Sequence, residues 1–252
     1  ERGMSVDRVI LHCDLNAFYA SVECIGNPQL KNVPMAVCGD PRSRHGIVLA
    51  KNELAKAFKV KTGEAIWQAK AKCPALVLAA PHHRLYSEYS KKVNQIYLRY
   101  TSQVEPFGID ESWLDVTGSS RLFGSGFEIA ERLRHEVREE LSLTISVGVS
   151  FNKVFAKLGS DYKKPDATTV ISRDNYKQLL YPLPVSDMLF VGRAAEKLLF
   201  SAGIKTIGDL AAADPALLRA ILHKQGGMLH AFACGEDDSP VLEYDSLAPA
   251  KS

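Results

Sequence analysis

The stretch VEPFGIDESWLDVTG, residues 104–118, is an apolar and β-branched run that is interrupted by two adjacent carboxylates. Its apolar parts, 104–109 and 113–116, predict two strands, with Asp110 and Glu111 between them at one edge of a sheet. Adjacent carboxylates repel each other, which raises one pKa unless a cation offsets the repulsion, so the pair favours a hard-metal site such as one for Mg²⁺. A polar turn explains the same two residues equally well, because acidic and small polar residues are common in turns.

A third carboxylate comes from the beginning of the chain. The run VILHCD, residues 9–14, predicts a strand that ends in Asp14, and residues 17–25 follow as a short helix. An Asp at the end of a strand is commonly a turn former or a helix N-cap. Asp14 can also join Asp110 and Glu111, and three such acids can hold two cations.

The order of elements along the chain predicts an α+β fold. Strands at 9–14, 104–116 and 143–150 are interspersed with amphipathic helices at 85–100 and 127–141. This order favours a largely antiparallel sheet with helices on one face, and it brings the three acids to one edge of that sheet.

Two further segments differ in character from the predicted sheet. Residues 26–84 place prolines around short elements, which predicts a small separate α/β subdomain with a cluster of lysines between 51 and 72. From residue 172 the chain is helical, and 191–210 has the pattern helix, glycine turn, helix. Such a turn lets backbone N–H groups approach a nucleic-acid phosphate, although a plain αα-hairpin has the same pattern.

The composition is that of a soluble globular protein. The chain has 252 residues with 46% apolar and 24% charged residues, enough for one large domain or two to three small ones. Its five cysteines are odd in number and contain no CxxC pair, which favours a reducing, cytoplasmic location over a disulfide framework or a zinc site. No apolar run approaches a membrane span. Residues 1–3, ahead of Met4, are interpreted as a tag remnant or native upstream sequence and are set aside.

Four segments together resemble the Y-family of translesion DNA polymerases, of the DNA polymerase IV type. They read DLNAFYASVE at 14–23, IDESWLDVT at 109–117, GVSFNKVFAK at 148–157, and the turn at 203–210. The resemblance extends from Val9 to about residue 243, and the order and spacing of the segments make it specific.

The resemblance implies a division into subdomains. A palm would comprise residues 4–17 and 85–172, and inserted fingers would comprise 18–84. An all-α thumb with a helix-hairpin-helix motif would comprise 173–240. Residues 241–252 would then be a linker to a little-finger domain that lies outside the sequence, so the chain is expected to be a catalytic core with weak, salt-dependent DNA binding.

The resemblance also implies an activity: template-directed addition of deoxynucleotides to a primer 3′-hydroxyl, in translesion synthesis and DNA repair. Two Mg²⁺ ions would be held by the carboxylates of Asp14, Asp110 and Glu111 and by the Leu15 carbonyl. The expected partners are primer-template DNA and deoxynucleoside triphosphates, with a sliding clamp bound through a C-terminal region outside this sequence. The protein is expected to be monomeric and to bind no membrane.

Contacts to the substrates follow from the same matching of segments. Tyr19 stands at the family's steric-gate position, where an aromatic ring would clash with a 2′-hydroxyl, and Phe18 would shape the nucleotide site. Lys157 matches a lysine that contacts the triphosphate. The thumb turn would contact DNA through Gly203, Ile204 and Thr206.

The chain departs from the family where a Tyr and an Arg usually grip the triphosphate. Glu53 and Lys56 occupy these two positions. A glutamate beside a triphosphate is repulsive by about 1 kcal/mol or more. We therefore expect Glu53 either to point away or to pair with Lys51 or Lys56.

Two alternative functions remain open at this level. A nucleotidyl cyclase also uses acids on a palm-like sheet for attack by a 3′-hydroxyl, but the inserted fingers and the helical hairpin argue against it. A catalytically inactive DNA-binding scaffold finds support only in Glu53 and Lys56. A cyclase would consume triphosphate without DNA, and a scaffold would show no stabilisation by nucleotide with Mg²⁺.

Overall fold

A five-stranded sheet forms the centre of the molecule in the computed structural model, which describes residues 7–40 and 46–246. The strand order is β5-β6-β1-β7-β8, and all pairs are antiparallel except β7 with β8. All six residues of the central strand β1 are buried, because both faces of the sheet are covered at this strand. The strands are β1 (Ile10–Leu15), β5 (Val104–Pro106), β6 (Glu111–Asp115), β7 (Ile145–Ser150) and β8 (Thr168–Val170).

The predicted α+β class is confirmed, with one correction to the placement of helices. The helices α4 (His83–Tyr97) and α6 (Gly126–Leu141) cover one face of the sheet, where they pack on Leu11 and Cys13 of β1. The shorter helix α7 (Lys153–Tyr162) lies against the opposite face, so the expectation of helices on a single face was incomplete. Because side chains alternate along a strand, His12 and Asp14 of β1 belong to the α7 face.

A very close approach between β7 and α7 explains why α7 fits on this face. A Cβ atom added to Gly148 would lie 1.8 Å from the carbonyl oxygen of Ala156 and 2.8 Å from the backbone of Gly159. Only glycine permits this contact, so Gly148 allows the helix to pack directly on the strand. The contact fixes α7 and its lysines close to the sheet.

The predicted subdomain at 26–84 forms a three-stranded sheet with its own apolar core. The core residues include Ala36, Val48 and Leu76. The preceding helix α1 (Phe18–Gly26) instead buries Phe18 and Val22 in the main cluster, against α4. The other elements are η1 (Pro28–Asn32), β2 (Met35–Cys38), β3 (Val48–Lys51), α2 (Glu53–Ala57), α3 (Ile66–Lys72) and β4 (Val77–Ala79), with strand order β3-β2-β4.

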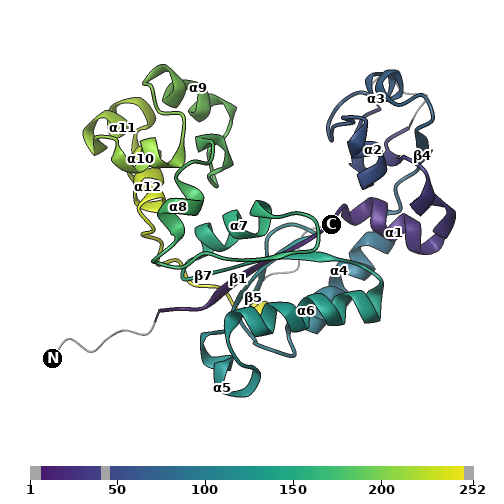
Figure 1. Cartoon of the computed structure of the whole chain (residues 1–252), viewed down its shortest axis with the longest axis horizontal. Coiled ribbons are helices and arrows are strands. Elements are labelled where there is room, and N and C mark those ends of the chain that lie inside the picture. The colour runs from purple at the N-terminus through teal and green to yellow at the C-terminus, as the bar shows by residue number, and fades with distance from the viewer. Residues whose placement is uncertain (1–6, 41–45, 247–252) are drawn as a thin grey trace.

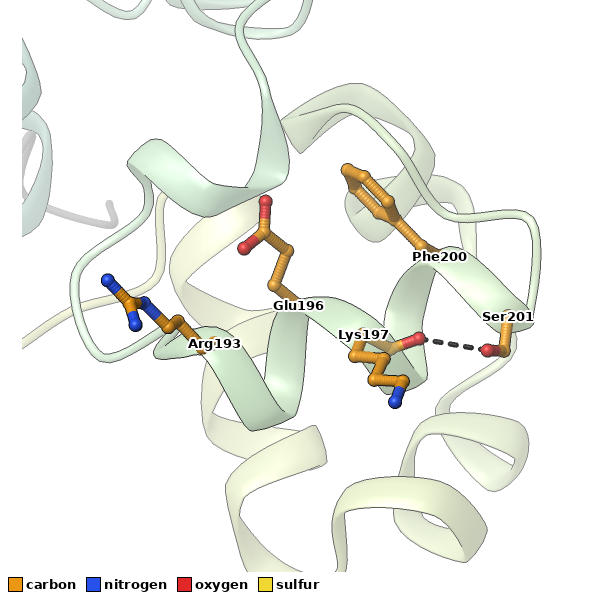
Figure 2. Close-up of a pocket in the computed structure, with 5 residues that line it drawn as sticks. All are labelled: Arg193, Glu196, Lys197, Phe200 and Ser201. Atoms are coloured by element: carbon orange, nitrogen blue, oxygen red, sulfur yellow. Dashed lines mark hydrogen bonds between the residues drawn. The ribbon is translucent and has the colours of Figure 1, made fainter.

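The helices after β8 gather around a third core. Figure 1 shows two modules at opposite ends of the sheet, both on the side where α7 lies. One is this helical module (176–233), and the other, called the α2–α3 module, comprises the three-stranded sheet with its helices (28–79). A cavity on α9 is lined by Arg193, Glu196, Lys197, Phe200 and Ser201, whose side chains Figure 2 shows. The helices are α8 (Tyr176–Leu180), α9 (Arg193–Ser201), α10 (Ile207–Ala212), α11 (Pro215–Leu222) and α12 (Lys224–Ala233), with η3 at Val185–Asp187.

The segment after α12 returns to the sheet. Val241 is buried in a small cluster with Ile10 and Trp113, and the backbone N–H of Leu242 donates to a carboxylate oxygen of Glu105 at 2.9 Å. The described part of the predicted linker, 241–246, is therefore anchored on the sheet, while 247–252 lies outside the described residues. The remaining elements are η2 (Thr117–Ser119), α5 (Ser120–Phe123) and η4 (Tyr244–Ser246).

None of the helices within 7–40 and 46–246 is long and apolar enough to cross a membrane. All five cysteines are free thiols, and four of them are buried.

Candidate active site

The three carboxylates named from the sequence meet at one edge of the sheet. Asp14 lies near the end of β1, directly opposite Glu111 at the start of β6. The backbone N–H of Leu15 donates to the carbonyl of Asp110 at 2.9 Å, which ties the loop before β6 to the end of β1. Opposed residues in an antiparallel pair have Cβ atoms about 5 Å apart, so Asp14 and Glu111 share one face.

The carboxylates at this edge have too little positive charge around them to offset their burial and mutual repulsion. Burial raises the pKa of Asp14 to about 7, although the ammonium of Lys164 acts against the shift. Burial and the charge of Glu111 raise the pKa of Asp110 as well. Bringing a further cation to these oxygens would relieve both penalties.

Glu111 is the most strongly compensated of the three acids. Both of its carboxylate oxygens accept hydrogen bonds from Lys157 Nζ at 2.9 Å, and His12 Nε2 lies 3.6 Å from Oε2. Burial raises the pKa of Glu111, but the ammonium of Lys157, which donates to both oxygens, acts against burial and holds that pKa below its usual range. Lys157, which was predicted to contact a triphosphate, is thus held on a carboxylate in this structure.

His12 is a member of the site that sequence reasoning missed. Its side chain is fully buried, and its Nδ1 lies 2.7 Å from the hydroxyl oxygen of Ser160. Because Ser160 donates its own hydrogen to the carbonyl of Lys157, it accepts from His12 Nδ1. Nε2, which has no hydrogen-bond partner among the described residues, then faces Glu111. A polar residue inside an apolar strand, two positions before Asp14, was the available signal.

Lys164 was missed as well. Its Nζ lies 2.7 Å from Oδ2 of Asp14 and 2.7 Å from Asp161. The side chain of Asn16 holds the loop that carries Lys164, because its Oδ1 accepts from the backbone N–H of Asp166 at 2.9 Å and its Nδ2 donates to Ser146. The sequence signal was weak, since Lys164 is one of two adjacent lysines in a polar loop.

The three carboxylates are suitable ligands for a hard cation, although their side chains are not arranged as a complete metal site. Among the described residues, no three His, Cys, Asp or Glu side chains are gathered closely enough to hold a metal ion. Carboxylate oxygens are the ligands that Mg²⁺ prefers, and the raised pKa values of Asp14 and Asp110 indicate unmet demand for positive charge. A bound cation would replace the ammonium groups of Lys157 and Lys164 at Glu111 and Asp14.

A cavity of about 380 Å³ lies beside the carboxylates. Its far wall comes from the α2–α3 module, where Lys56 Nζ lies 3.4 Å from Glu53 Oε2, so Lys56 is the lysine that pairs with Glu53. Phe18 lines the cavity, whereas the ring of Tyr19 stacks on Tyr86. Its lining consists of Asp14, Leu15, Asn16, Ala17, Phe18, Leu49, Ala50, Lys51, Glu53, Lys56, Thr62, Asp110, Glu111, Lys164 and Pro165.

The turn predicted to contact DNA lies between α9 and α10. Gly203 has φ +81°, which explains the glycine, and Ile204 is buried. Backbone N–H groups in the turn already have acceptors: Gly203 donates to Phe200, and Thr206 to the carboxylate of Asp209. The Thr206 hydroxyl accepts from the Asp209 N–H and keeps its own hydrogen to donate.

A family model described as "impB/mucB/samB family" matches residues 13–161, which include the whole carboxylate edge and α7 up to Asp161. The chain belongs to this family. It is 54% identical over 245 residues to a DNA polymerase IV of Acetivibrio thermocellus, covering 97% of this chain and 61% of that protein. It is 42% identical over 232 residues to a DNA polymerase IV of Pelotomaculum thermopropionicum, covering 92% of this chain and 58% of that protein.

Solved structures with the same fold include a chimera of the Y-family DNA polymerase Dbh, with a TM-score of 0.85 and 28% identity, covering 92% of this chain and 69% of that chain. DinB from Sulfolobus solfataricus has a TM-score of 0.83 and 28% identity, over 92% of this chain and 69% of that chain. The resemblance to Y-family polymerases is thereby confirmed. The chain spans about three fifths of the length of the curated relatives it matches.

Proposed function

We propose that this chain is the catalytic core of a template-directed DNA polymerase that joins deoxynucleotides to a primer 3′-hydroxyl, in translesion synthesis and DNA repair. The observation that carries the proposal is the meeting of Asp14, Asp110 and Glu111 at one sheet edge, beside a cavity of about 380 Å³. The DNA polymerase IV names of the relatives support the same activity. Neither alternative function has a comparable supporting observation.

In this proposal two Mg²⁺ ions are held by the carboxylates of Asp14, Asp110 and Glu111, with the Leu15 carbonyl as a further ligand. Such ions make a hydroxyl a better nucleophile and stabilise the attacking and leaving oxygens of an in-line displacement. The chain's own groups supply charge and position. Lys157 and Lys164, once released from Glu111 and Asp14, lie where they can neutralise a triphosphate.

The nucleotide would enter between the carboxylates and the α2–α3 module. Lys56 then faces its phosphates from the far side of the cavity, and Phe18 shapes the floor. Tyr19 is proposed as the steric gate that excludes a 2′-hydroxyl. Pairing with Lys56 reduces the repulsion that Glu53 would otherwise exert on the phosphates.

Primer-template DNA would cross the α7 side of the sheet, between the two modules that Figure 1 places at its ends. We propose that these modules act as fingers (18–84) and thumb (173–240), with a palm of 4–17 and 85–172. The thumb turn would contact a phosphate through the Thr206 hydroxyl, with Gly203 and Ile204 giving close backbone approach. A similar Dbh structure is described as an insertion ternary complex, which supports DNA and nucleotide as joint substrates.

Primer extension tests the proposal. The 252-residue chain, a 5′-labelled primer on a template and the four deoxynucleotides with Mg²⁺ should give products that lengthen by single template-directed nucleotides. Extension should stop when template, nucleotide or Mg²⁺ is left out. Consumption of a triphosphate without DNA would identify a cyclase, and an unextended primer with no nucleotide-dependent rise in melting temperature would identify a scaffold; either result contradicts the proposal.

A further inference from the structure

The ring of Tyr19 is part of an aromatic stack that joins two helices. It lies on the ring of Tyr86 with centroids 4.1 Å apart and an angle of 14° between the planes. His83 meets both rings edge-on, at 5.9 Å from Tyr19 and 5.8 Å from Tyr86. Tyr19 comes from α1, whereas Tyr86 and His83 come from α4.

Tyr86 is itself held from the same helix that carries Tyr19. It is fully buried, and its hydroxyl donates a hydrogen bond to Oε1 of Glu23. Glu23 follows Tyr19 by four residues on α1, so the two side chains share one face of that helix. The same carboxylate oxygen lies 2.9 Å from Nδ1 of His82, which adds a second contact to α4.

This arrangement leaves the Tyr19 ring little freedom. Tyr86 covers one of its faces, and the Glu23 bond prevents Tyr86 from moving aside. Burial raises the pKa of the Tyr19 phenol, and the negative charge of Asp110 adds to this shift. The ring is therefore supported on one face by a buried side chain.

We infer that Tyr86, held by Glu23, is a positioning residue that makes Tyr19 a rigid wall against ribonucleotides. The inference rests on the proposed function, since it concerns the sugar of the incoming nucleotide. The Tyr19 ring excludes a ribonucleotide only if it cannot move away when the 2′-hydroxyl contacts it. Without the support, Tyr19 can tilt into the space left by the missing ring, and the ribonucleotide then fits.

The test compares deoxynucleotide with ribonucleotide in matched variants. The kcat/KM for insertion of dATP and of ATP opposite dT is measured for the wild type, Tyr86→Leu, Tyr86→Phe, Glu23→Gln and Tyr19→Ala. Dissociation constants of dATP and ATP are measured in parallel on complexes with a dideoxy-terminated primer, where no turnover occurs. Tyr89→Leu is the control on the same helix, because the Tyr89 ring lies under Lys92 instead of Tyr19. Melting temperatures confirm that each variant is folded.

We expect the dATP/ATP preference to fall about tenfold in Tyr86→Leu, the scale of one aromatic stacking contact. Tyr86→Phe keeps the ring, and Glu23→Gln keeps an acceptor for the hydroxyl, so both should retain more of the preference than Tyr86→Leu, and Tyr89→Leu should retain all of it. If Tyr86 has a purely structural role, Tyr86→Leu lowers the kcat/KM for dATP and for ATP by the same factor and leaves the dATP/ATP ratio unchanged. That result overturns the inference. If Tyr19→Ala loses the preference while Tyr86→Leu keeps it, the inference fails and the proposed function stands. If the wild type binds dATP and ATP with equal dissociation constants, Tyr19 does not act as a steric gate.

Discussion

The ammonium of Lys164 lies 2.7 Å from Oδ2 of Asp14, although 150 residues separate the two in the chain. At the same sheet edge, Lys157 donates to both carboxylate oxygens of Glu111. Two lysines are thus paired with two of the three carboxylates that are proposed as metal ligands. Binding of cations and a triphosphate would exchange these ion pairs, with the cations taking the carboxylates and the lysines taking the phosphates.

Lys164→Ala should raise the KM for the incoming deoxynucleotide. The variant loses one charge-assisted contact to the phosphates, which corresponds to a rise in the KM for deoxynucleotide of about tenfold or more. Lys163→Ala is the matched control, because Lys163 is the exposed neighbour in the same loop. Steady-state single-nucleotide insertion measures both variants. An equal KM for the two variants would remove Lys164 from the proposed nucleotide site.

Glu53→Gln should strengthen nucleotide binding. The side chains of Glu53 and Lys56 are each more than half exposed, so their pair contributes at most about 1 kcal/mol to stability. Removing the carboxylate frees Lys56 and ends the repulsion with the phosphates, and the KM should fall about fivefold. Glu88→Gln, which breaks a surface pair with Arg84 at 3.2 Å, serves as control. A higher KM for Glu53→Gln than for Glu88→Gln would mean that Glu53 contacts the substrate favourably.

Two neighbouring glycines of α12 should respond oppositely to alanine. A Cβ on Gly226 would lie 2.2 Å from the carbonyl oxygen of Leu218, whereas nothing lies within 4 Å of a Cβ on Gly227. Gly226→Ala should therefore cost about 2–3 kcal/mol by forcing α11 and α12 apart. Gly227→Ala should be neutral or stabilise by up to about 1 kcal/mol through helix propensity. Urea unfolding measures both, and equal destabilisation would contradict the packing of α11 on α12.

Much of the fold follows from local patterns in the sequence. The apolar run at 9–14 became β1 (Ile10–Leu15), and the helical spacing at 127–141 became α6 (Gly126–Leu141). These elements were predictable because burial of one face leaves a period of 2 or 3.6 in the sequence. The side of the sheet on which α7 packs was not, since the glycine contact that permits it joins Gly148 to a later helix.

The site was predictable only in part, for a similar reason. Asp14, Asp110 and Glu111 stand out as acids in or beside apolar strands, and the family motifs made their meeting expected. His12 and Lys164 acquire their roles from partners 148 and 150 residues away, which no local pattern records. The pairing of Glu53 with Lys56 could be stated only as one of several outcomes, because it depends on side-chain conformations on a short exposed helix.

The central claim is that the carboxylates of Asp14, Asp110 and Glu111 hold the metal ions on which the reaction depends. The most direct test is Asp110→Asn, with Asp115→Asn as its control. Asp110 directly precedes β6, whereas Asp115 is the last residue of that strand. The Oδ1 of Asp115 accepts from the Thr117 N–H, a bond that asparagine keeps. Primer extension is measured under single-turnover conditions, with melting temperatures as a check on folding. We predict that Asp110→Asn lowers the rate by about 10³-fold, since an ionic ligand contributes several kcal/mol to the transition state, while Asp115→Asn stays within about threefold of the wild type. A wild-type rate in Asp110→Asn would contradict the account.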